Sequence, residues 1–316
     1  MDILDGGNDE FAGDIGLGID AGGTQTRWAL IDTGGQLVAS GEVAGVSALQ
    51  IDSADGRAQL QASFDALARQ VLRHGCPAQV YAGLTGFAGD RETLRRLIAG
   101  PLCLSARAVT LSTDIEIAYL DIFRPGEGYV VYAGTGSIGA YIDAQGRLHR
   151  AGGYGVMLDD AGGGFWIARE ALRHIWRNED ETPGAWQSSP MARRIFDLIG
   201  GADWSHSRAF VYGRERGEIG KLALAVAATA DRDWAARGIL ASAGRELARL
   251  ALVLIRRFGL REVALTGRAA QLHPVIAQEF RAALPPSVTV HVGQAQGHIA
   301  AARLAVRAIR APGLNA

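Results

Sequence analysis

Two short glycine-rich turns carry the residue types best suited to phosphate chemistry. One reads Asp20-Ala21-Gly22-Gly23-Thr24 and the other reads Ala133-Gly134-Thr135-Gly136-Ser137. Glycines let the backbone come close to an anion and turn its N–H groups toward it, and a threonine hydroxyl adds a donor. Asp20 stands beside those donors, where a carboxylate suits Mg²⁺, bound directly or through water. Alone, the first turn is equally well explained as an ordinary hairpin, but the pair predicts two facing hairpins that bind the phosphates of one nucleotide.

Other nucleotide-binding motifs fit the sequence less well. Gly134-x-Gly136-x-x-Gly139 satisfies the dinucleotide fingerprint, which requires a helix to begin there. Residues 140–143, followed by Ala144-Gln145-Gly146, indicate a strand and a turn instead, and Gly16-x-Gly18-x-x-Ala21 fails in the same way. A Walker A loop needs lysine followed by serine or threonine, whereas the only lysine of the chain, Lys221, precedes Leu222.

Two further features supply acidic side chains. The stretch from Gly152 to Gly164 holds six glycines and Asp160. A carboxylate on such a scaffold suits a polyhydroxylated ligand, because it accepts hydrogen bonds from neighbouring hydroxyls, although a flexible surface loop has the same composition. Asp114 follows a short strand predicted over residues 109–111. An aspartate in that place is ordinarily a helix cap, so its functional interpretation depends on the loops around it.

The pattern of apolar residues predicts two similar α/β domains. Strands joined by glycine-rich turns form an antiparallel meander over residues 15–43, and the same pattern returns from residue 129. Leu60, Phe64, Leu67 and Val71 recur at helical spacing and stop before Gly75. The other predicted elements are strands at 80–84, 263–266 and 288–292, a mostly helical stretch at 165–260 and a final helix at 299–309.

Length and composition restrict the number of domains and the class of partner. The 316 residues suggest two domains. A net charge of −1 gives no reason to expect a nucleic-acid or membrane partner, and no apolar run is long enough to span a membrane. Cys76 and Cys103 are too few for a disulfide framework. We therefore expect a cytoplasmic protein with a small-molecule ligand.

Taken in order, these features resemble the sugar kinase, actin and heat-shock-chaperone ATPase superfamily, and within it the BadF/BadG/BcrA/BcrD ATPase family branch that contains N-acetylglucosamine kinases. The most specific stretch is Gly152 to Leu172, G-G-Y-G-x-x-L-x-D-x-G-x-G-x-W-I-x-R-E-A-L. It is close to that branch's run G-W-G-x-x-L-G-D-E-G-S-G-x-W-I-G-x-x-A-L. The resemblance, from about Ile15 to Ile309, implies an α/β protein of two ribonuclease-H-like (actin-like ATPase) domains with a nucleotide and sugar cleft between them.

The domain boundaries follow from these patterns. We expect a disordered acidic tail at 1–14, an N-terminal ATPase-fold domain at 15–125 completed by a C-terminal helix at about 297–310, and a C-terminal ATPase-fold domain at 126–296 with a helical insertion.

The resemblance also implies roles for single residues. Asp114 matches the sugar-side aspartate that acts as catalytic base, and Asp20 the carboxylate on the Mg²⁺ side. The implied nucleotide contacts are Gly22, Gly23, Thr24, Gly134, Thr135, Gly136, Ser137 and, near the adenosine, Gly267. The implied contacts with an amino sugar are Asp114, Thr85, Gly153, Tyr154 and Asp160. ATP and Mg²⁺ are the implied cofactors, and the cysteine-rich contexts of zinc or iron–sulfur relatives are missing.

Several positions depart from the family pattern, and all but the adenosine motif are on the sugar or base side. The sequence has Thr113 for Asn, Tyr154 for Trp, Ala161 for Glu and Gly163 for Ser, no Asn near Leu49, and T-G-R in place of the adenosine G-G. The implied activity is ATP-dependent phosphorylation of N-acetylglucosamine or glucosamine at the 6-hydroxyl. The alternative is a nucleotide-binding sensor or activator that phosphorylates no sugar. Anhydro-muramic sugar and glucose remain open as substrates, and a homodimer remains open as the assembly.

Overall fold

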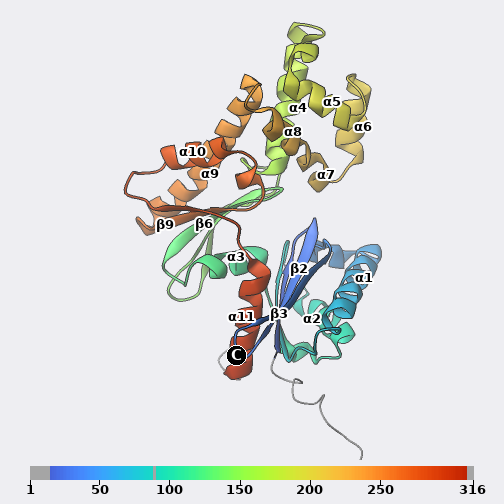
Figure 1. The fold of residues 1–316 in the computed structure, drawn as a ribbon, viewed down its shortest axis with the longest axis vertical. Helices are drawn as coiled ribbons and strands as arrows, with labels where there is room; N and C mark the ends of the chain where they lie inside the picture. Colours follow the sequence, from blue (N-terminus) through green and yellow to red (C-terminus); the bar gives the residue numbers. More distant parts are fainter. Residues whose placement is uncertain (1–14, 88–89, 312–316) are drawn as a thin grey trace, which may run out of the picture. The chain divides into compact units, whose positions relative to one another are not determined.

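The structure is a computed structural model that describes residues 15–87 and 90–311. The predicted acidic tail, residues 1–14, lies outside the described residues. The chain divides into two compact units. The first unit contains the residues up to Asp121 and those from Gln296 onward, and the second unit contains Ile122–Ala295. Figure 1 labels the helices and strands of both.

The first unit is built on a five-stranded mixed sheet of order β3-β2-β1-β4-β5. Its first three strands form an antiparallel meander, and β1, β4 and β5 run parallel. The strands are β1 (Ile15–Ala21), β2 (Gln25–Asp32), β3 (Leu37–Ala44), β4 (Gln79–Leu84) and β5 (Val109–Thr113). The helices are α1 (Ala54–Val71), α2 (Arg91–Ala99), α3 (Asp114–Ile122) and α11 (Gly297–Arg310).

Successive residues of β1 point to opposite faces of the sheet, and the two faces pack against different helices. Leu17 and Ile19 belong to a large core cluster that includes the buried residues of α1 and α2. Gly16 and Gly18 face α11, and a Cβ built on Gly18 would lie 2.1 Å from the backbone nitrogen of Ala302. In Figure 1, α11 lies on one side of this sheet and α1 and α2 lie on the other. The glycines therefore let a helix approach the strand more closely than any side chain would permit.

The second unit repeats the same sheet topology, with order β10-β9-β6-β7-β8. Its antiparallel meander is β6 (Gly128–Ala133), β7 (Ser137–Ile142) and β8 (Leu148–Gly152), and the parallel neighbours are β9 (Glu262–Thr266) and β10 (Val290–Val292). The helices are α4 (Gly164–Glu181), α5 (Pro190–Ile199), α6 (Trp204–Gly213), α7 (Arg216–Gly220), α8 (Leu222–Thr229), α9 (Trp234–Phe258) and α10 (Pro274–Ala282). Thus both meanders predicted from the sequence are confirmed.

Most predicted elements are present, with differences at their ends. The helix expected through Leu60 and Val71 is α1, and Asp90 caps α2 by accepting the N–H groups of Glu92 and Thr93. The strand expected at 288–292 is shorter, because the N–H of Val288 closes a turn onto the carbonyl of Pro285. No helix follows Gly136, where β7 begins instead, so the rejection of the dinucleotide fingerprint is confirmed.

The contact between β1 and α11 gives a stability prediction. We expect Gly18→Ala to lower the free energy of unfolding by about 1–3 kcal/mol, because its methyl group would overlap the α11 backbone. The matched control is Gly100→Ala in the same unit, where a Cβ meets nothing within 4 Å and the backbone is right-handed. Urea denaturation measures both. Equal stability of the two variants would contradict the close packing.

Candidate functional site

In the first unit, the predicted site residues lie at the carboxyl ends of parallel strands. The register aligns Asp20 on β1 with Gly83 on β4, and Gly83 with Ser112 on β5. Thr85 and Asp114 come directly after β4 and β5. Carboxyl ends of neighbouring parallel strands share one edge of a sheet, which is where open α/β sheets bind ligands. The fold therefore brings Asp20, Thr85 and Asp114 together.

The first glycine turn joins β1 to β2 at this edge. The N–H of Gly22 donates to the carbonyl of Gln25 at 3.1 Å, which closes the hairpin. Gly23 and Thr24 are exposed, and a Cβ on Gly23 would meet nothing within 4 Å. Below the turn, a Cβ on Gly45 would lie 2.3 Å from the carbonyl carbon of Thr24. The turn is thus supported from one side and open at Gly23.

Asp20 pairs with an arginine across the hairpin. Arg27 lies directly opposite Asp20 in the β1–β2 register, and its Nη2 is 2.6 Å from Asp20 Oδ2. Burial raises the pKa of Asp20, Arg27 opposes that shift, and the charge of Asp121 adds to it. A half-buried salt bridge therefore holds this carboxylate in place.

Asp114 opens helix α3 but does not cap it. The N-cap is Thr113, whose hydroxyl accepts the N–H of Glu116 at 3.2 Å while Glu116 Oε2 accepts the N–H of Thr113 at 2.9 Å. The alternative interpretation of Asp114 as a helix cap is therefore not supported, because the neighbouring threonine and Glu116 complete a capping box. Thr113, a departure from the family pattern, has this structural role.

The Asp114 carboxyl is consequently free for other contacts. Its Oδ1 accepts the N–H of Ile115 at 2.9 Å, and its side chain is hydrogen-bonded to Thr85. Burial and then the nearby charge of Asp20 raise the pKa of Asp114 to about 6, while these hydrogen bonds oppose the shift. A carboxyl with this pKa is mostly ionised at neutral pH and still accepts a proton readily.

The amino end of α11 closes this side of the first unit. A Cβ on Gly297 would lie 3.2 Å from Asp20 Oδ2, and Asp121 Oδ2 accepts the N–H of Gln296 at 2.7 Å. His298 follows, with its Nδ1 buried and unpartnered within the described residues. Burial, helped by the charge of Arg27, lowers the pKa of His298 to about 4. The positive end of the helix dipole therefore faces carboxylates beside a neutral imidazole.

A segment near residue 49 borders Thr85. The N–H of Ala48 donates to the carbonyl of Thr85 at 3.0 Å, and Ser47 caps a short 3-10 helix, Ala48–Asp52. Leu49 is exposed and would be 2.8 Å from a Cβ on Gly86, whose φ is +67°. An apolar side chain therefore stands beside the hydrogen-bonding partner of Asp114.

In the second unit, the other glycine turn is docked onto a helix. The carbonyls of Gly134 and Thr135 accept the N–H groups of Gly164 and Phe165, the first residues of α4, at 2.9 and 3.0 Å. Ser137 is buried, and its hydroxyl donates to the carbonyl of Ala161 at 2.8 Å. These bonds use the first helical N–H groups and the serine hydroxyl internally, so any anion at this turn would meet other backbone donors.

Asp160 lies against this turn as well. Its Oδ2 would be 2.1 Å from a Cβ on Gly136, and its Oδ1 accepts the N–H of Gly155 at 3.1 Å. Its φ is +52°, rare for a residue other than glycine. Burial raises its pKa, partly offset by the Gly155 hydrogen bond. The structure thus brings Asp160 to the second turn.

Three other predicted positions differ in their surroundings. Gly267, just after β9, has φ +96°, and a Cβ there would be 2.3 Å from the carbonyl oxygen of Ala133, so it touches the start of the second turn. Gly153 has φ +71° and lies next to Ile138. Tyr154 is 69% exposed, and its side chain forms no hydrogen bond or ring contact with the described residues.

Sequence reasoning missed Arg27, Asp121 and His298. Arg27 was detectable, because a hairpin that turns at Gly23 places residues 20 and 27 opposite each other. Asp121 and His298 gave no local signal, since their place beside Asp20 depends on the tertiary packing of α11. No group of three or more His, Cys, Asp or Glu residues within the described ranges could hold a metal ion, so a Mg²⁺ ion here would rely on one or two carboxylates and on ligand oxygens, as is usual for this ion.

Residues 17–297 match the sequence model of the BadF/BadG/BcrA/BcrD ATPase family. The chain is 26% identical over 180 residues to an N-acetyl-D-glucosamine kinase of Dictyostelium discoideum, across 53% of this chain and 56% of that one. It is 28% identical over 142 residues to an N-acetylmuramic acid/N-acetylglucosamine kinase of Clostridium acetobutylicum, across 44% and 45%. The chain spans about half the length of the curated relatives it matches.

A solved structure resembles nearly the whole chain. A candidate N-acetylglucosamine kinase from Chromobacterium violaceum superposes with a TM-score of 0.67 at 25% identity, over 93% of this chain and 99% of that one. Together with the repeated sheet order, this confirms the predicted α/β class with two ribonuclease-H-like domains of the actin-like ATPase type. Among the helices that the structure describes, none is long and apolar enough to cross a membrane.

The raised pKa of Asp114 gives a prediction about stability. A carboxyl whose pKa is about 6 when folded and about 4 when unfolded destabilises the native state as pH rises through that interval. We expect Asp114→Asn to raise the free energy of unfolding by about 1–3 kcal/mol at pH 7.5, with the gain vanishing near pH 4. Urea denaturation across this pH range measures it, with the exposed Asp52→Asn as control. A gain independent of pH would contradict the assigned shift.

Proposed function

The chain belongs to the BadF/BadG/BcrA/BcrD ATPase family, and from that membership we propose that it is an ATP-dependent sugar kinase. The observation that carries the proposal is Asp114, a carboxyl with a pKa of about 6 at the carboxyl ends of parallel strands. A general base works best when its pKa lies near the operating pH. Thr85 and the N–H of Ile115 orient this carboxylate.

The reaction we propose needs alignment and one proton acceptor. Asp114 accepts the proton of a sugar hydroxyl as its oxygen forms a bond to the γ-phosphorus of ATP, and the bond from that phosphorus to the β-phosphate oxygen breaks, releasing ADP. Phosphoryl transfer asks the protein mainly for positioning and charge neutralisation. Gly23 and Thr24 supply the exposed part of a turn for phosphate oxygens, and the half-buried Gly22 begins that turn.

The residues of the first unit suit a divalent cation. Asp20 supplies a hard oxygen donor, and Asp121 adds negative charge near it. Arg27 already satisfies one Asp20 oxygen, which favours contact through water over direct coordination. When bound, Mg²⁺ would neutralise charge on the phosphate oxygens. In the second unit, Gly134, Thr135, Gly136 and Gly267 remain the proposed nucleotide contacts.

We propose N-acetylglucosamine as the first substrate to test, phosphorylated at its 6-hydroxyl. Two matched relatives are named as kinases of N-acetylglucosamine, one of them also of N-acetylmuramic acid. Leu49 and the buried Ala161 stand where related enzymes use polar residues, and neither can hydrogen-bond a sugar through its side chain. The proposed sugar contacts are Thr85, Gly153, Tyr154 and Asp160, so glucosamine and glucose belong in the same assay.

Sugar-dependent ADP release tests the proposal. We expect Asp114→Asn to lower kcat by about 10²- to 10⁴-fold, because the hydroxyl loses its proton acceptor, while the affinity for ATP changes little. Asp52→Asn, the exposed control, should keep wild-type rates. A purified, folded Asp114→Asn protein that retains most of the activity would show that another group is the base.

The same assay separates the kinase from the alternative function. A panel of N-acetylglucosamine, glucosamine, glucose and anhydro-muramic sugar is compared for stimulation of ADP release. Bound ATP without stimulation by any sugar would instead favour a nucleotide-binding sensor or activator, which Ala161, an apolar residue at the family's glutamate position, would suit.

The pKa of Asp114 also predicts the pH profile. We expect kcat/KM to fall about tenfold per pH unit below pH 6, as the base becomes protonated. Asp20→Asn removes the like charge that helps raise this pKa, so the acid limb of the remaining activity should move to lower pH. Steady-state rates between pH 5 and 8 measure the limb in both proteins. An unmoved limb in Asp20→Asn would contradict the coupling.

A further inference from the structure

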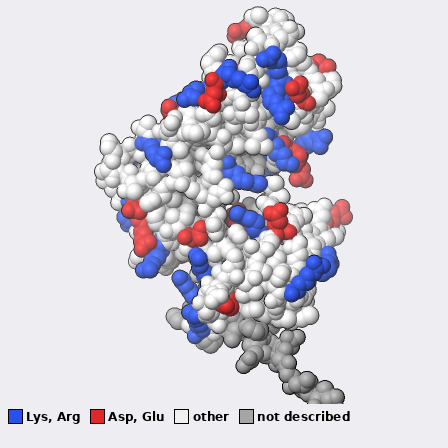
Figure 2. All heavy atoms as spheres, in the orientation of Figure 1, with Lys and Arg blue, Asp and Glu red and all other residues white. Residues whose placement is uncertain are grey.

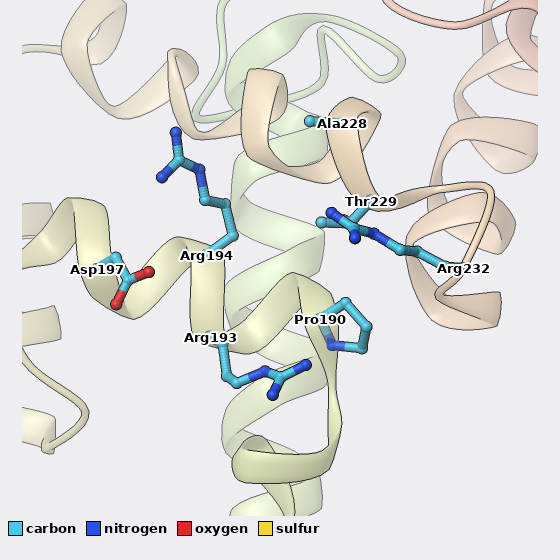
Figure 3. A pocket seen from close by; sticks show the side chains of 7 residues that line it. All are labelled: Pro190, Arg193, Arg194, Asp197, Ala228, Thr229 and Arg232. Atoms are coloured by element: carbon cyan, nitrogen blue, oxygen red, sulfur yellow. The ribbon is translucent and has the colours of Figure 1, made fainter.

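A cavity of about 370 Å³, open to solvent and lined mostly by exposed residues, lies at the surface of the helices of the second unit, apart from the glycine turns. Its walls come from α5, from the end of α8 and from the segment that follows α8 (Figure 3). The lining residues are Pro190, Arg193, Arg194, Asp197, Ala228, Thr229 and Arg232. None of them belongs to the site proposed above.

The cavity is rich in arginines that lack a counter-ion. Arg193, Arg194 and Arg232 form no ion pair or side-chain hydrogen bond with any residue in the described ranges. Some other arginines of this unit do form ion pairs, for example Arg245 with Glu279 at 2.6 Å. Three guanidinium groups and the single carboxylate of Asp197 leave an excess of two positive charges.

The arginines are held on a fixed frame. Asp233 Oδ2 accepts the Ser189 hydroxyl at 2.7 Å and the N–H of Met191 at 3.0 Å, while its Oδ1 accepts N–H groups at the start of α9. This buried carboxylate ties the beginning of α5 to the segment that carries Arg232. Its oxygens accept four hydrogen bonds from uncharged donors, and Asp233 forms no ion pair with Arg193 or Arg232.

The side chains within the cavity differ in direction. Figure 3 shows Arg193 and Arg232 directing their guanidinium groups toward the space beside the Pro190 ring, whereas Arg194 points away. Figure 2 shows Lys and Arg side chains gathered over the helical part of this unit, with acidic ones beside them. Thr229 is buried, and its hydroxyl donates to carbonyls of its own helix, so it forms a wall.

We propose that this cavity binds the phosphate of a small phosphate monoester between Arg193 and Arg232. Guanidinium groups match phosphate oxygens bidentately, and the two positive charges of Arg193 and Arg232 suit a dianion. The volume falls within the usual range of small-molecule sites. The ring of Pro190 and the methyl of Ala228 supply apolar surface for the organic part of the ligand. This site is independent of the proposed kinase activity.

Calorimetric titration of the full chain with methyl phosphate tests the proposal. The experiment is run at pH 8, where this probe is a dianion, and without nucleotide, whose terminal phosphate would compete for the same arginines. We expect saturable binding, weakened about tenfold or more by Arg193→Gln and by Arg232→Gln. Arg194→Gln should weaken it less, because its guanidinium points away from the cavity. Dimethyl phosphate, a monoanion, should bind more weakly than methyl phosphate.

The matched control is Arg208→Gln, an exposed arginine of α6 that does not line the cavity. It should bind methyl phosphate as the wild type does. Absence of saturable binding in the wild type would overturn the proposal. So would equal affinity in the wild type, Arg193→Gln and Arg232→Gln, because the phosphate would then bind elsewhere, for example at a glycine turn. If the protein showed no sugar-dependent ADP release, the proposed kinase activity would be wrong, but the methyl phosphate binding result would still stand.

Discussion

The close approach of α11 to β1 is the contact on which the first site depends. Gly16 and Gly18 leave no side chain between strand and helix, so the helix backbone lies directly on the sheet. That packing brings Gly297 beside Asp20 and lets Asp121 bind the N–H of Gln296. Because α11 is separated from β1 by the whole second unit in sequence, the site forms only once both ends of the chain have folded together. A helix amino end stabilises negative charge, which offsets part of the repulsion among these carboxylates.

The buried carboxylates of the first unit lower its stability, and the same burial sets the pKa of Asp114. Burial beside Asp20 destabilises ionised Asp114, yet the same burial raises its pKa toward the range where a carboxylate accepts protons well. Arg27 opposes the burial-driven rise in the pKa of Asp20 across the hairpin, and His298 stays neutral because burial and Arg27 both disfavour its charged form. The first unit therefore gives up stability to keep a basic carboxylate at the strand ends, as is common at functional sites.

Local sequence patterns were enough to predict the strands and helices of the fold. The hydrogen bonds of the site depend on tertiary contacts, which these patterns do not contain. Hairpin glycines and helical spacing predicted both meanders, α1 and the cap at Asp90, because these depend on neighbouring residues. The cap of α3 could not be identified from the sequence, where Asp114 and Thr113 both have suitable side chains, and it is the pair of Thr113 and Glu116 that forms it. Ser137 shows the same limit: its hydroxyl is used by the carbonyl of Ala161, a partner that appears only when the loop folds back on the turn. Arg193 and Arg232 share a cavity because α5 packs on α8, which no spacing in the sequence indicates.

The two units show how one topology gives two different turns. Each turn joins the first two strands of a meander, but the first is open at Gly23 while the second is fixed by hydrogen bonds to α4 and by the Asp160 carboxylate over Gly136. An open turn can adapt to a ligand, whereas a docked turn is already ordered and loses little conformational entropy on binding. The second turn also depends on Gly267, since any side chain there would collide with Ala133. Its geometry is therefore set by three separate segments, and a substitution in any one of them would move the turn without touching a ligand.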